Sequence, residues 1–419
     1  MMPEAPPLET EQMRILYLTG ESLERSWAPT HHVLGTCQAF AKQGHEVTLI
    51  HAFPTRPRRV ASAWAKAEIT RWSPPVRGGG RLFHRSIARY LRTHAAEIAA
   101  EFDVLYIRFI ASTVIAEALT HITIPTVLEV NGSEEFAARG FNECTRASDL
   151  VLVDSAAMAE MFRHRLPDQA AKVAVHVSPA TDIERFAPRD KQACRAFVGL
   201  SPDAIILLHV SGFWTHHDFR TAELALRQLN QGSQRAMLVL LGDGPRWRAV
   251  RSSLMDLIKS GQVLMPGAVP IAEVPLYIGA ADVCLNLWHA PFLRRGNLLG
   301  FKLYEYVASE RPVIESADFT FPIQEWARKT LWLVPPESPE RVANAVLSIT
   351  SDAARWKARC AEGRSYVKQF RSWDAATRST VSKLLDLRQR LGTSSVFGTN
   401  GHVPASSLDI QPATGSVYE

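Results

Sequence analysis

Short apolar segments that alternate with longer amphipathic segments constrain this chain more than any other feature of its sequence. "MRILYLTG" (13–20) has the composition of a buried strand, a helix that stops at Gly44 follows, and "EVTLIHA" (46–52) is a second strand. Strand, helix and strand in this order form the basic unit of a parallel sheet. Further apolar strands are predicted at 103–109, 125–130, 149–155 and 172–179. The first part of the chain is therefore predicted to be a doubly wound α/β domain.

The same pattern restarts after residue 200. "AIILLHVSG" (204–212) and "AMLVLLGDGP" (236–245) are predicted strands, each followed by a helix, and shorter strands follow in "QVLMPG", "ADVCLNLW", "RPVIES" and "TLWLVPP". We therefore expect two α/β domains, at 13–185 and 186–370, and a helix at 371–392 that crosses back to the first domain. The ends, 1–12 and 393–419, are expected to be disordered. Ligands of open α/β sheets bind beyond the carboxyl ends of the strands, so the expected site lies where the two domains face each other.

Composition indicates the cellular compartment of the protein and the kinds of metal site it is expected to lack. Its five cysteines, at 37, 144, 194, 284 and 360, lie far apart and form no CxxC motif and no Cys/His cluster. This argues for reduced thiols and against a zinc site. The N-terminal segment is acidic and proline-rich, unlike a signal peptide. The sequence contains no run of about 18 apolar residues, the length needed to cross a membrane. We expect a cytoplasmic protein, with the inner face of the membrane as an alternative location.

Positive charge is concentrated in residues 56–92, which hold nine arginines and one lysine against a single acid, Glu68. A helix that starts at Arg81 would carry arginines on one face and apolar residues on much of the rest (Arg81, Arg85, Arg89, Arg92; Leu82, Phe83, Ile87, Tyr90, Leu91). Trp64 and Trp72 are expected in the loop before it. A basic amphipathic helix suits an anionic membrane or a lipid-diphosphate acceptor. The alternative is an ordinary surface helix, and no nucleic-acid motif accompanies the charge.

The segment "GNLLGFKLYEYVASERPVIES" (296–316) places two opposite charges on one helix face. Gly300 opens the predicted helix, and Lys302 and Glu305 lie three residues apart, so their side chains are neighbours. Two interpretations stay open at this point. The pair is either a solvated ion pair, or it holds a ligand at the N-terminus of the helix.

Eight motifs follow one another along the chain: "QGHEVTLI", "TVLEVNG", "ASDLVLVDSAAMAEMF", "DIERFAP", "LGDGP", "VPLYIGAADVCLNL", "FKLYEYVASERPVI" and "FRSWDAA". They span about residues 13–390, and in this order they resemble glycosyltransferase family four. That family comprises retaining, metal-independent enzymes with the GT-B fold of two Rossmann-like domains. The resemblance implies a nucleotide-sugar donor on the second domain. It implies a carbohydrate, lipid-linked or small-molecule acceptor on the first.

The resemblance also implies donor-binding residues. The second glutamate of the family's Glu-x7-Glu motif matches Glu305 and would accept the ribose hydroxyls. The backbone of Gly300 and Phe301 would face the diphosphate and sugar, and a related subset of the family has lysine at the place of Lys302. Three places depart from the pattern. Asn297 replaces the first glutamate, while Phe213 and His217 stand after the retained Gly212 where arginine and lysine are usual. His217 is a candidate phosphate contact, and Arg295 or its neighbour Arg294 could supply the missing cation.

The first domain differs more from the family's sequence pattern, because the glycine pair that the family has after the first strand is absent. Thr30, His31 and His32 are expected to face the ligand there, and Asn131, with Ser133 and Glu134, occupies the mid-domain loop. Asn131 and His217 are the catalytic candidates, although the family uses no protein nucleophile and the departing diphosphate is thought to deprotonate the acceptor. No acidic cluster suggests a divalent ion, so we expect no metal and no cofactor.

The departures leave an alternative function open. A GT-B homologue that has lost its phosphate-binding cations would serve as a binding or scaffold subunit, and a sugar-nucleotide epimerase is a more distant possibility. The sequence does not identify the donor sugar, the base of the donor nucleotide or the acceptor.

Overall fold

The computed structural model describes residues 11–23, 28–52, 69–72, 80–108, 110–232, 235–293 and 300–396. Its contacts divide the chain into two compact units. Unit 1 holds the chain up to Ala180 together with the helix that begins at Trp373, and unit 2 runs from Thr181 to Ser372. Unit 2 begins five residues before the predicted boundary, because the Thr181 N–H donates to the carbonyl of Arg371 at 2.8 Å. The segments expected to be disordered lie outside the described residues, except for 11–12 and for 393–396, which are described.

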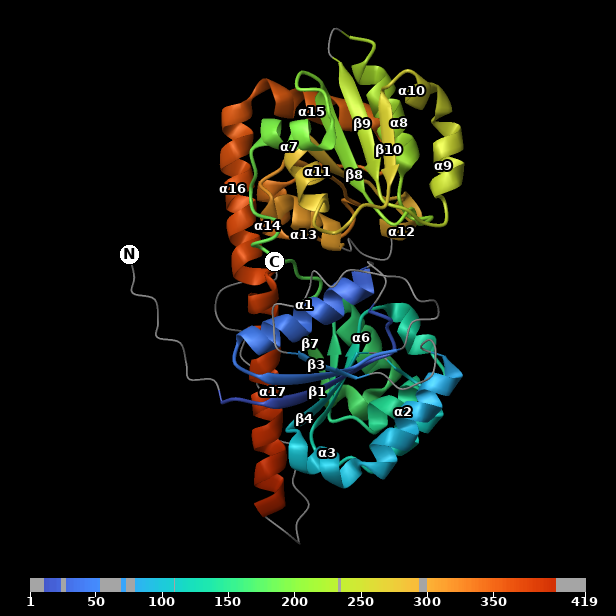
Figure 1. Cartoon of the computed structure of the whole chain (residues 1–419), viewed down its shortest axis with the longest axis vertical. Coiled ribbons are helices and arrows are strands. Elements are labelled where there is room, and N and C mark those ends of the chain that lie inside the picture. Colours follow the sequence, from blue (N-terminus) through green and yellow to red (C-terminus); the bar gives the residue numbers. More distant parts are fainter. Residues whose placement is uncertain are drawn as a thin grey trace, which may run out of the picture. The chain divides into compact units, whose positions relative to one another are not determined.

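Unit 1 contains a parallel sheet with the strand order β3-β2-β1-β4-β5-β6-β7. Figure 1 labels β1, β3, β4 and β7 of this sheet. The strands are β1 (Arg14–Thr19), β2 (Glu46–Ile50), β3 (Ile69–Trp72), β4 (Val104–Arg108), β5 (Thr126–Val130), β6 (Leu150–Val153) and β7 (Val173–Val175). All of the predicted strands are present. β3 is an addition, since Trp72 was expected in a loop and instead ends an edge strand that pairs with β2.

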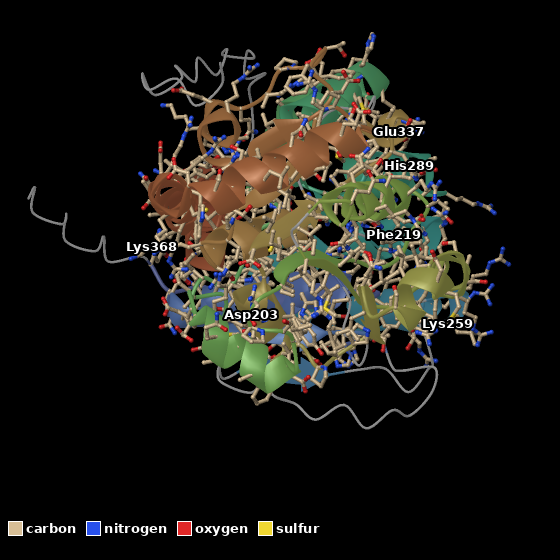
Figure 2. The ribbon with its side chains drawn as sticks, turned by 90° about the horizontal axis from the view of Figure 1, so that it is seen from above. Asp203, Phe219, Lys259, His289, Glu337 and Lys368 are labelled. Carbon is tan, nitrogen blue, oxygen red and sulfur yellow. The ribbon has the colours of Figure 1, made fainter. Side chains whose placement is uncertain are left out.

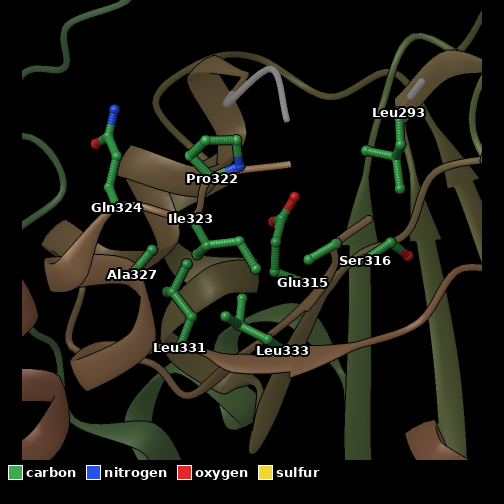
Figure 3. Close-up of a pocket in the computed structure, with 10 residues that line it drawn as sticks. Leu293, Glu315, Ser316, Pro322, Ile323, Gln324, Ala327, Leu331 and Leu333 are labelled. Carbon is green, nitrogen blue, oxygen red and sulfur yellow. The ribbon is translucent and has the colours of Figure 1, made fainter. Parts of the chain in front are cut away.

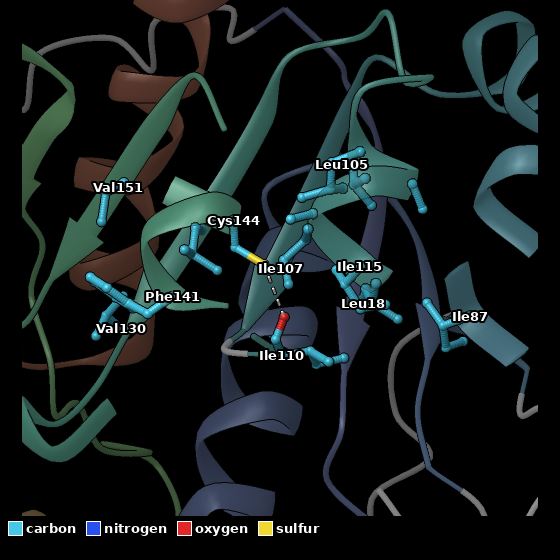
Figure 4. Packing of buried hydrophobic residues seen from close by; sticks show 14 of the residues in the cluster. Leu18, Ile87, Leu105, Ile107, Ile110, Ile115, Val130, Phe141, Cys144 and Val151 are labelled. Atoms are coloured by element: carbon cyan, nitrogen blue, oxygen red, sulfur yellow. Dashed lines mark hydrogen bonds between the residues drawn. The ribbon is translucent and has the colours of Figure 1, made fainter. Parts of the chain in front are cut away.

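Helices cover both faces of this sheet, which is why its strands are apolar nearly throughout. Successive residues of β1 alternate between the faces. Leu16 and Leu18 belong to the same buried cluster as Phe83 and Ile87. Figure 4 shows part of this cluster, including Leu18, Ile87 and Cys144. That face carries α2 (Arg81–Thr93), α3 (Ala95–Glu101), α4 (Thr113–Leu119), α5 (Phe141–Arg146) and α6 (Ala156–Arg165). The opposite face carries α1 (Ala28–Lys42) and α17 (Trp373–Val396).

Unit 2 contains a second parallel sheet, with the order β10-β9-β8-β11-β12-β13. Its strands are β8 (Ile205–Val210), β9 (Ala236–Leu241), β10 (Val263–Gly267), β11 (Val283–Asn286), β12 (Val313–Ser316) and β13 (Trp332–Val334). The strand order reverses between β8 and β11. The loops that follow these two strands therefore diverge, which is the arrangement that creates ligand sites in open α/β sheets.

Helices also cover both faces of the second sheet. One face carries α7 (Lys191–Val198), α11 (Val274–Ala280), α13 (Phe301–Ala308), α14 (Glu325–Thr330) and α16 (Ala353–Phe370). The other carries α8 (Phe219–Leu229), α9 (Trp247–Ser253), α10 (Met255–Lys259) and α15 (Pro339–Ser351). The single helix predicted after "LGDGP" is thus two helices, which meet at Leu254.

The loops that follow β11 and β13, the strands on either side of β12, contact each other. A short helix, α12 (Ala290–Leu293), follows β11, and His289 before it pairs with Glu337 after β13 at 3.3 Å (Figure 2). Among the helices in the described part of the chain, none combines the length and the apolar character needed to cross a membrane.

The packing of α17 gives a first prediction. Leu384 on this helix is fully buried against the α1 face of unit 1, whereas Leu391, two turns later, is 38% exposed. We expect Leu384→Ala to lower the free energy of unfolding by about 2–5 kcal/mol, because it leaves a cavity. Leu391→Ala is the matched control and should cost less than about 1 kcal/mol. Urea denaturation followed by circular dichroism measures both, and equal losses would show that α17 does not pack as described.

Candidate active site

The predicted helix with the lysine–glutamate pair is α13, and it is anchored firmly in unit 2. Leu303, Tyr304, Tyr306 and Val307 are buried on it, and the Tyr306 hydroxyl accepts the Val210 N–H at the end of β8 at 2.7 Å. Gly300 is its N-cap, in an extended conformation without a side-chain cap. The first N–H groups of this helix therefore lack a capping side chain at the residue that usually provides one, and such N–H groups favour an anion.

Lys302 and Glu305 form the expected ion pair, with Lys302 Nζ 2.8 Å from Glu305 Oε2. The Glu305 side chain is 10% exposed and that of Lys302 is 29% exposed. The pair is thus neither a solvated surface pair nor a sealed interior one. Its lysine keeps access to solvent beside the N-terminus of α13.

The loop after β8 is held in place by the "LGDGP" turn. Gly244 has a φ of +158°, and a Cβ on it would lie 1.7 Å from the carbonyl oxygen of Gly212. Only glycine permits this approach. Gly212 itself lies under the indole of Trp214, since a Cβ there would be 2.7 Å from Trp214 Nε1. The "LGDGP" motif therefore shapes the candidate donor loop.

Phe213, at the place where the family has arginine, turns into the core of unit 2. Its φ is +48°, its side chain is fully buried, and its ring stacks on Phe219 at 4.7 Å. Trp214, the next residue, is 49% exposed. This position therefore contributes no charge to the loop.

His217 is buried in an aromatic cluster and is neutral. Its ring stacks on Trp288 at 5.0 Å, and His216 stacks on the same indole at 5.4 Å. The Nδ1 atom of His217 accepts the Trp214 N–H at 3.2 Å, which leaves the proton on Nε2. Burial, with the nearby rings of His209 and His216, lowers the pKa of His217 to about 2. His217 therefore does not replace the positive charge of the family's lysine. Asn297, Arg294 and Arg295 lie outside the described residues.

In unit 1, a polar cluster lies where β1, β4 and β5 end. Strand register places Arg108 opposite Glu129, and the Tyr106 hydroxyl donates to Glu129 Oε2 at 2.6 Å. His32 Nε2 lies 2.5 Å from Glu129 Oε1. Burial alone would raise the pKa of Glu129, but the charge and hydrogen bond of His32, with His176 and Arg108, hold that pKa well below its ordinary value. Glu129 is therefore a buried, compensated carboxylate.

The expected acceptor residues fall into two groups. Thr30 and His32 are buried, with the Thr30 hydroxyl donating to the Ser22 carbonyl at 3.3 Å and His32 held by Glu129. Both side chains are therefore buried, and their role at an acceptor stays a prediction. His31 and Asn131 are partly exposed, and the Asn131 N–H donates to Glu135 Oε2 at 3.0 Å. Within the described ranges, no three His, Cys, Asp or Glu side chains gather in a way that could hold a metal ion.

Sequence reasoning did not single out Glu129, Arg108 or Glu315, the last a buried glutamate at the end of β12. Each is a charged residue at or next to the carboxyl end of an otherwise apolar strand, in "VLYIR", "TVLEV" and "VIES". A buried ionisable group either pairs with another group or shifts its pKa, so this pattern was the available signal.

Two family models match the chain. The model described as Glycosyltransferase Family 4 matches residues 30–185, and the one described as Glycosyl transferases group 1 matches residues 204–352. Together they cover most of both units.

The sequence relatives of the chain are also named as glycosyltransferases. The chain is 28% identical over 220 residues to a GDP-mannose-dependent alpha-(1-6)-phosphatidylinositol monomannoside mannosyltransferase of Mycobacterium tuberculosis, a match that covers 50% of this chain and 54% of the relative. It is 30% identical over 260 residues to a D-inositol 3-phosphate glycosyltransferase of Saccharomonospora viridis, covering 59% of this chain and 57% of the relative. The chain thus matches little more than half the length of these relatives.

Among solved structures, Anabaena HepE in complex with UDP resembles the chain with a TM-score of 0.64. The likeness covers 89% of this chain and 100% of the other, at 14% sequence identity. At this identity the likeness concerns the fold, which is GT-B as the sequence predicted.

The buried imidazoles beneath the β8 loop predict a pH dependence of stability. His209 is 1% exposed, and neither ring nitrogen has a hydrogen-bond partner within the described residues. Burial lowers its pKa to about 4, so the folded state resists protonation, and stability present above about pH 6.5 is lost as the pH falls toward 4. We expect His209→Leu to reduce the stability lost between pH 7 and pH 5 by about 2 kcal/mol. Denaturation at both pH values tests this, with exposed His121→Leu as the control that should leave the loss unchanged.

Proposed function

The chain belongs to glycosyltransferase family four, and on that premise we propose that it transfers a sugar from a nucleotide-diphosphate sugar to an acceptor hydroxyl. The observation that carries the proposal is the partly exposed Lys302, which Glu305 holds beside the N-terminus of α13. A helix N-terminus and one lysine provide positive potential for a diphosphate without a metal. We therefore propose a metal-independent reaction. Retention of the sugar's configuration is proposed from the resemblance to the family.

In this proposal the residues act by binding and orientation. The Glu305 carboxylate has a second oxygen beside the one that Lys302 contacts, and a carboxylate accepts two hydrogen bonds from the vicinal hydroxyls of a ribose. Lys302 and the first N–H groups of α13 would stabilise negative charge on the departing diphosphate. That diphosphate would take the proton of the incoming hydroxyl on the same face of the sugar. Unit 1 would hold the acceptor, with His31 and Asn131 as its partly exposed candidates.

A second function has its own support. Phe213 faces the core and His217 is neutral, so the β8 loop contributes neither of the two cations that the family usually has there. A chain that binds no nucleotide would act as a scaffold subunit instead. The donor base also needs a test, because one relative is named for GDP-mannose and the structural neighbour was solved with UDP.

Nucleotide titration distinguishes the two functions. We expect one of UDP, GDP, ADP and TDP to bind the chain in isothermal titration calorimetry with a chelator present. Glu305→Gln should weaken that binding at least tenfold, or about 1.4 kcal/mol, because the amide carries no negative charge and has an NH2 donor in place of one acceptor oxygen.

Glu223→Gln is the matched control for this titration. Glu223 is also a buried helical glutamate in unit 2, paired three residues away with Arg220 at 2.7 Å and with Arg227 at 3.0 Å. Its replacement should leave nucleotide affinity unchanged. Absence of binding by all four nucleotides would favour the scaffold function, and equal effects of the two variants would reduce Glu305 to a structural role.

We also propose that α2 contacts an anionic membrane. Phe83, Ile87 and Leu91 bury one face of this helix in unit 1, while Arg81, Arg85, Arg89 and Arg92 are exposed on the other. Leu82, expected on the apolar side, is instead 65% exposed among the arginines and could enter the lipid headgroup region. Residues 56–68, with Trp64, lie outside the described residues. A lipid-linked acceptor would be reached from this surface.

Vesicle sedimentation tests the membrane contact. Arg85→Glu/Arg89→Glu should reduce binding to vesicles that contain phosphatidylserine by at least tenfold, since each basic residue near such a surface contributes about 1 kcal/mol. Arg341→Glu/Arg355→Glu changes the net charge equally at exposed positions of unit 2 and should have little effect. Equal losses in the two variants would mean that net charge alone drives binding, contrary to the proposal.

A further inference from the structure

A small pocket in unit 2 plays no part in the function proposed above. It lies between the end of β12 and α14, and its walls are mainly apolar, with Leu293, Pro322, Ile323, Leu331 and Leu333 among them (Figure 3). Its volume is about 70 Å³. That space exceeds the roughly 10–15 Å³ that one water molecule requires, so the pocket admits a small polar group but no nucleotide.

Among the described residues that line this pocket, Glu315 is the one with an ionisable side chain, and it is 2% exposed. Figure 3 shows its carboxyl group pointing into the space between Leu293 and Ile323. Two neutral groups hold it. Strand register places Asn286 opposite Glu315, and Asn286 Nδ2 donates to Oε2 at 2.6 Å. Trp288 Nε1 donates to Oε1 at 3.1 Å.

No positive charge compensates this carboxyl group in the part of the chain that the structure describes. None of the ion pairs there, which extend to 4.0 Å between nitrogen and oxygen, includes Glu315. The other polar groups of the lining already accept hydrogen bonds, Ser316 Oγ from the Trp288 N–H at 3.2 Å and Gln324 Oε1 from Trp326 Nε1 at 2.6 Å. Despite its two donors, burial raises the pKa of Glu315 to about 8. The group is therefore mostly a neutral acid at pH 7.

We propose that this pocket binds the ammonium group of an amine-bearing ligand and that Glu315 is the residue that recognises it. A buried carboxylate is stable only beside a countercharge, which an ammonium supplies and a hydroxyl does not. The apolar walls would enclose the carbon atoms next to the nitrogen. On binding, the Glu315 proton leaves to solvent and a carboxylate–ammonium pair remains, with no bond to carbon made or broken.

Trp288 connects this pocket to the N-terminus of α13. Its indole donates to Glu315, and its ring lies against Gly300, where a Cβ would be 3.5 Å away. The ammonium could therefore belong to an amino sugar or to a separate, short-chain amine. The inference goes beyond the proposed function and does not depend on it, since the pocket is complete without a nucleotide.

Calorimetry with paired probes tests the inference. Glucosamine and ethanolamine carry ammonium groups, while N-acetylglucosamine and ethylene glycol are their uncharged counterparts. We expect at least one ammonium probe to bind at least tenfold more tightly than its counterpart. Titrations at pH 7 in two buffers of different ionisation enthalpy should show close to one proton released per bound probe. A preference for glucosamine indicates a sugar amine, and a preference for ethanolamine indicates a short-chain amine.

Two variants complete the test. Glu315→Gln keeps the side-chain size and should weaken binding of the ammonium probe at least tenfold, while Glu325→Gln, an exposed glutamate paired with Lys329, should not. The inference is overturned if neither ammonium probe binds or if the uncharged counterparts bind equally well. The comparison of paired probes on the unmodified chain decides the matter even if Glu315→Gln fails to fold. Nucleotide affinity is measured separately, so failure here leaves the proposed transferase function untouched.

Discussion

Coverage of both sheet faces is the constraint on which the rest of this structure depends. In each unit, helices bury the residues that point to either side of the parallel strands, so the strands have room for few charges. Polar side chains appear where the strands end and the loops begin. They come in register from neighbouring strands, as Arg108 opposite Glu129 in unit 1 and Asn286 opposite Glu315 in unit 2. The sheet thus determines which polar residues meet and on which edge they meet.

The two buried glutamates, Glu129 and Glu315, have the same carboxyl group but opposite pKa shifts, because their neighbours differ. Glu129 is held by His32 and lies beside Arg108, so its charge is compensated within unit 1 and its pKa is lowered. Glu315 is held only by the neutral donors Asn286 and Trp288, and its pKa is raised. The compensated carboxylate of Glu129 links α1 to the sheet through His32. Ionisation of an uncompensated buried carboxyl group costs desolvation free energy, and a positively charged ligand can offset that cost.

The sequence was informative wherever an interaction is local. The apolar strands follow from composition, and the Lys302–Glu305 pair follows from spacing along one helix. Sequence reasoning failed where the partner is distant. The burial of His217 depends on Trp288, some seventy residues later, and Phe213 turns inward to stack on Phe219. β3 escaped prediction because "ITRW" is short and lies in a strongly basic segment, where the pairing with β2 decides its conformation. Glu315 was not predicted as a site residue because the resemblance implies only residues that match the family's motifs.

The central claim is that the N-terminus of α13 binds the diphosphate of a nucleotide sugar, with Glu305 on the ribose. The most direct measurement is a crystal structure of the chain with the nucleoside diphosphate that binds most tightly. The account predicts the diphosphate against the first N–H groups of α13 and beside Lys302, and both ribose hydroxyls within hydrogen-bond distance of Glu305. A nucleotide bound elsewhere, or a Glu305 that contacts only Lys302 in the complex, would contradict it.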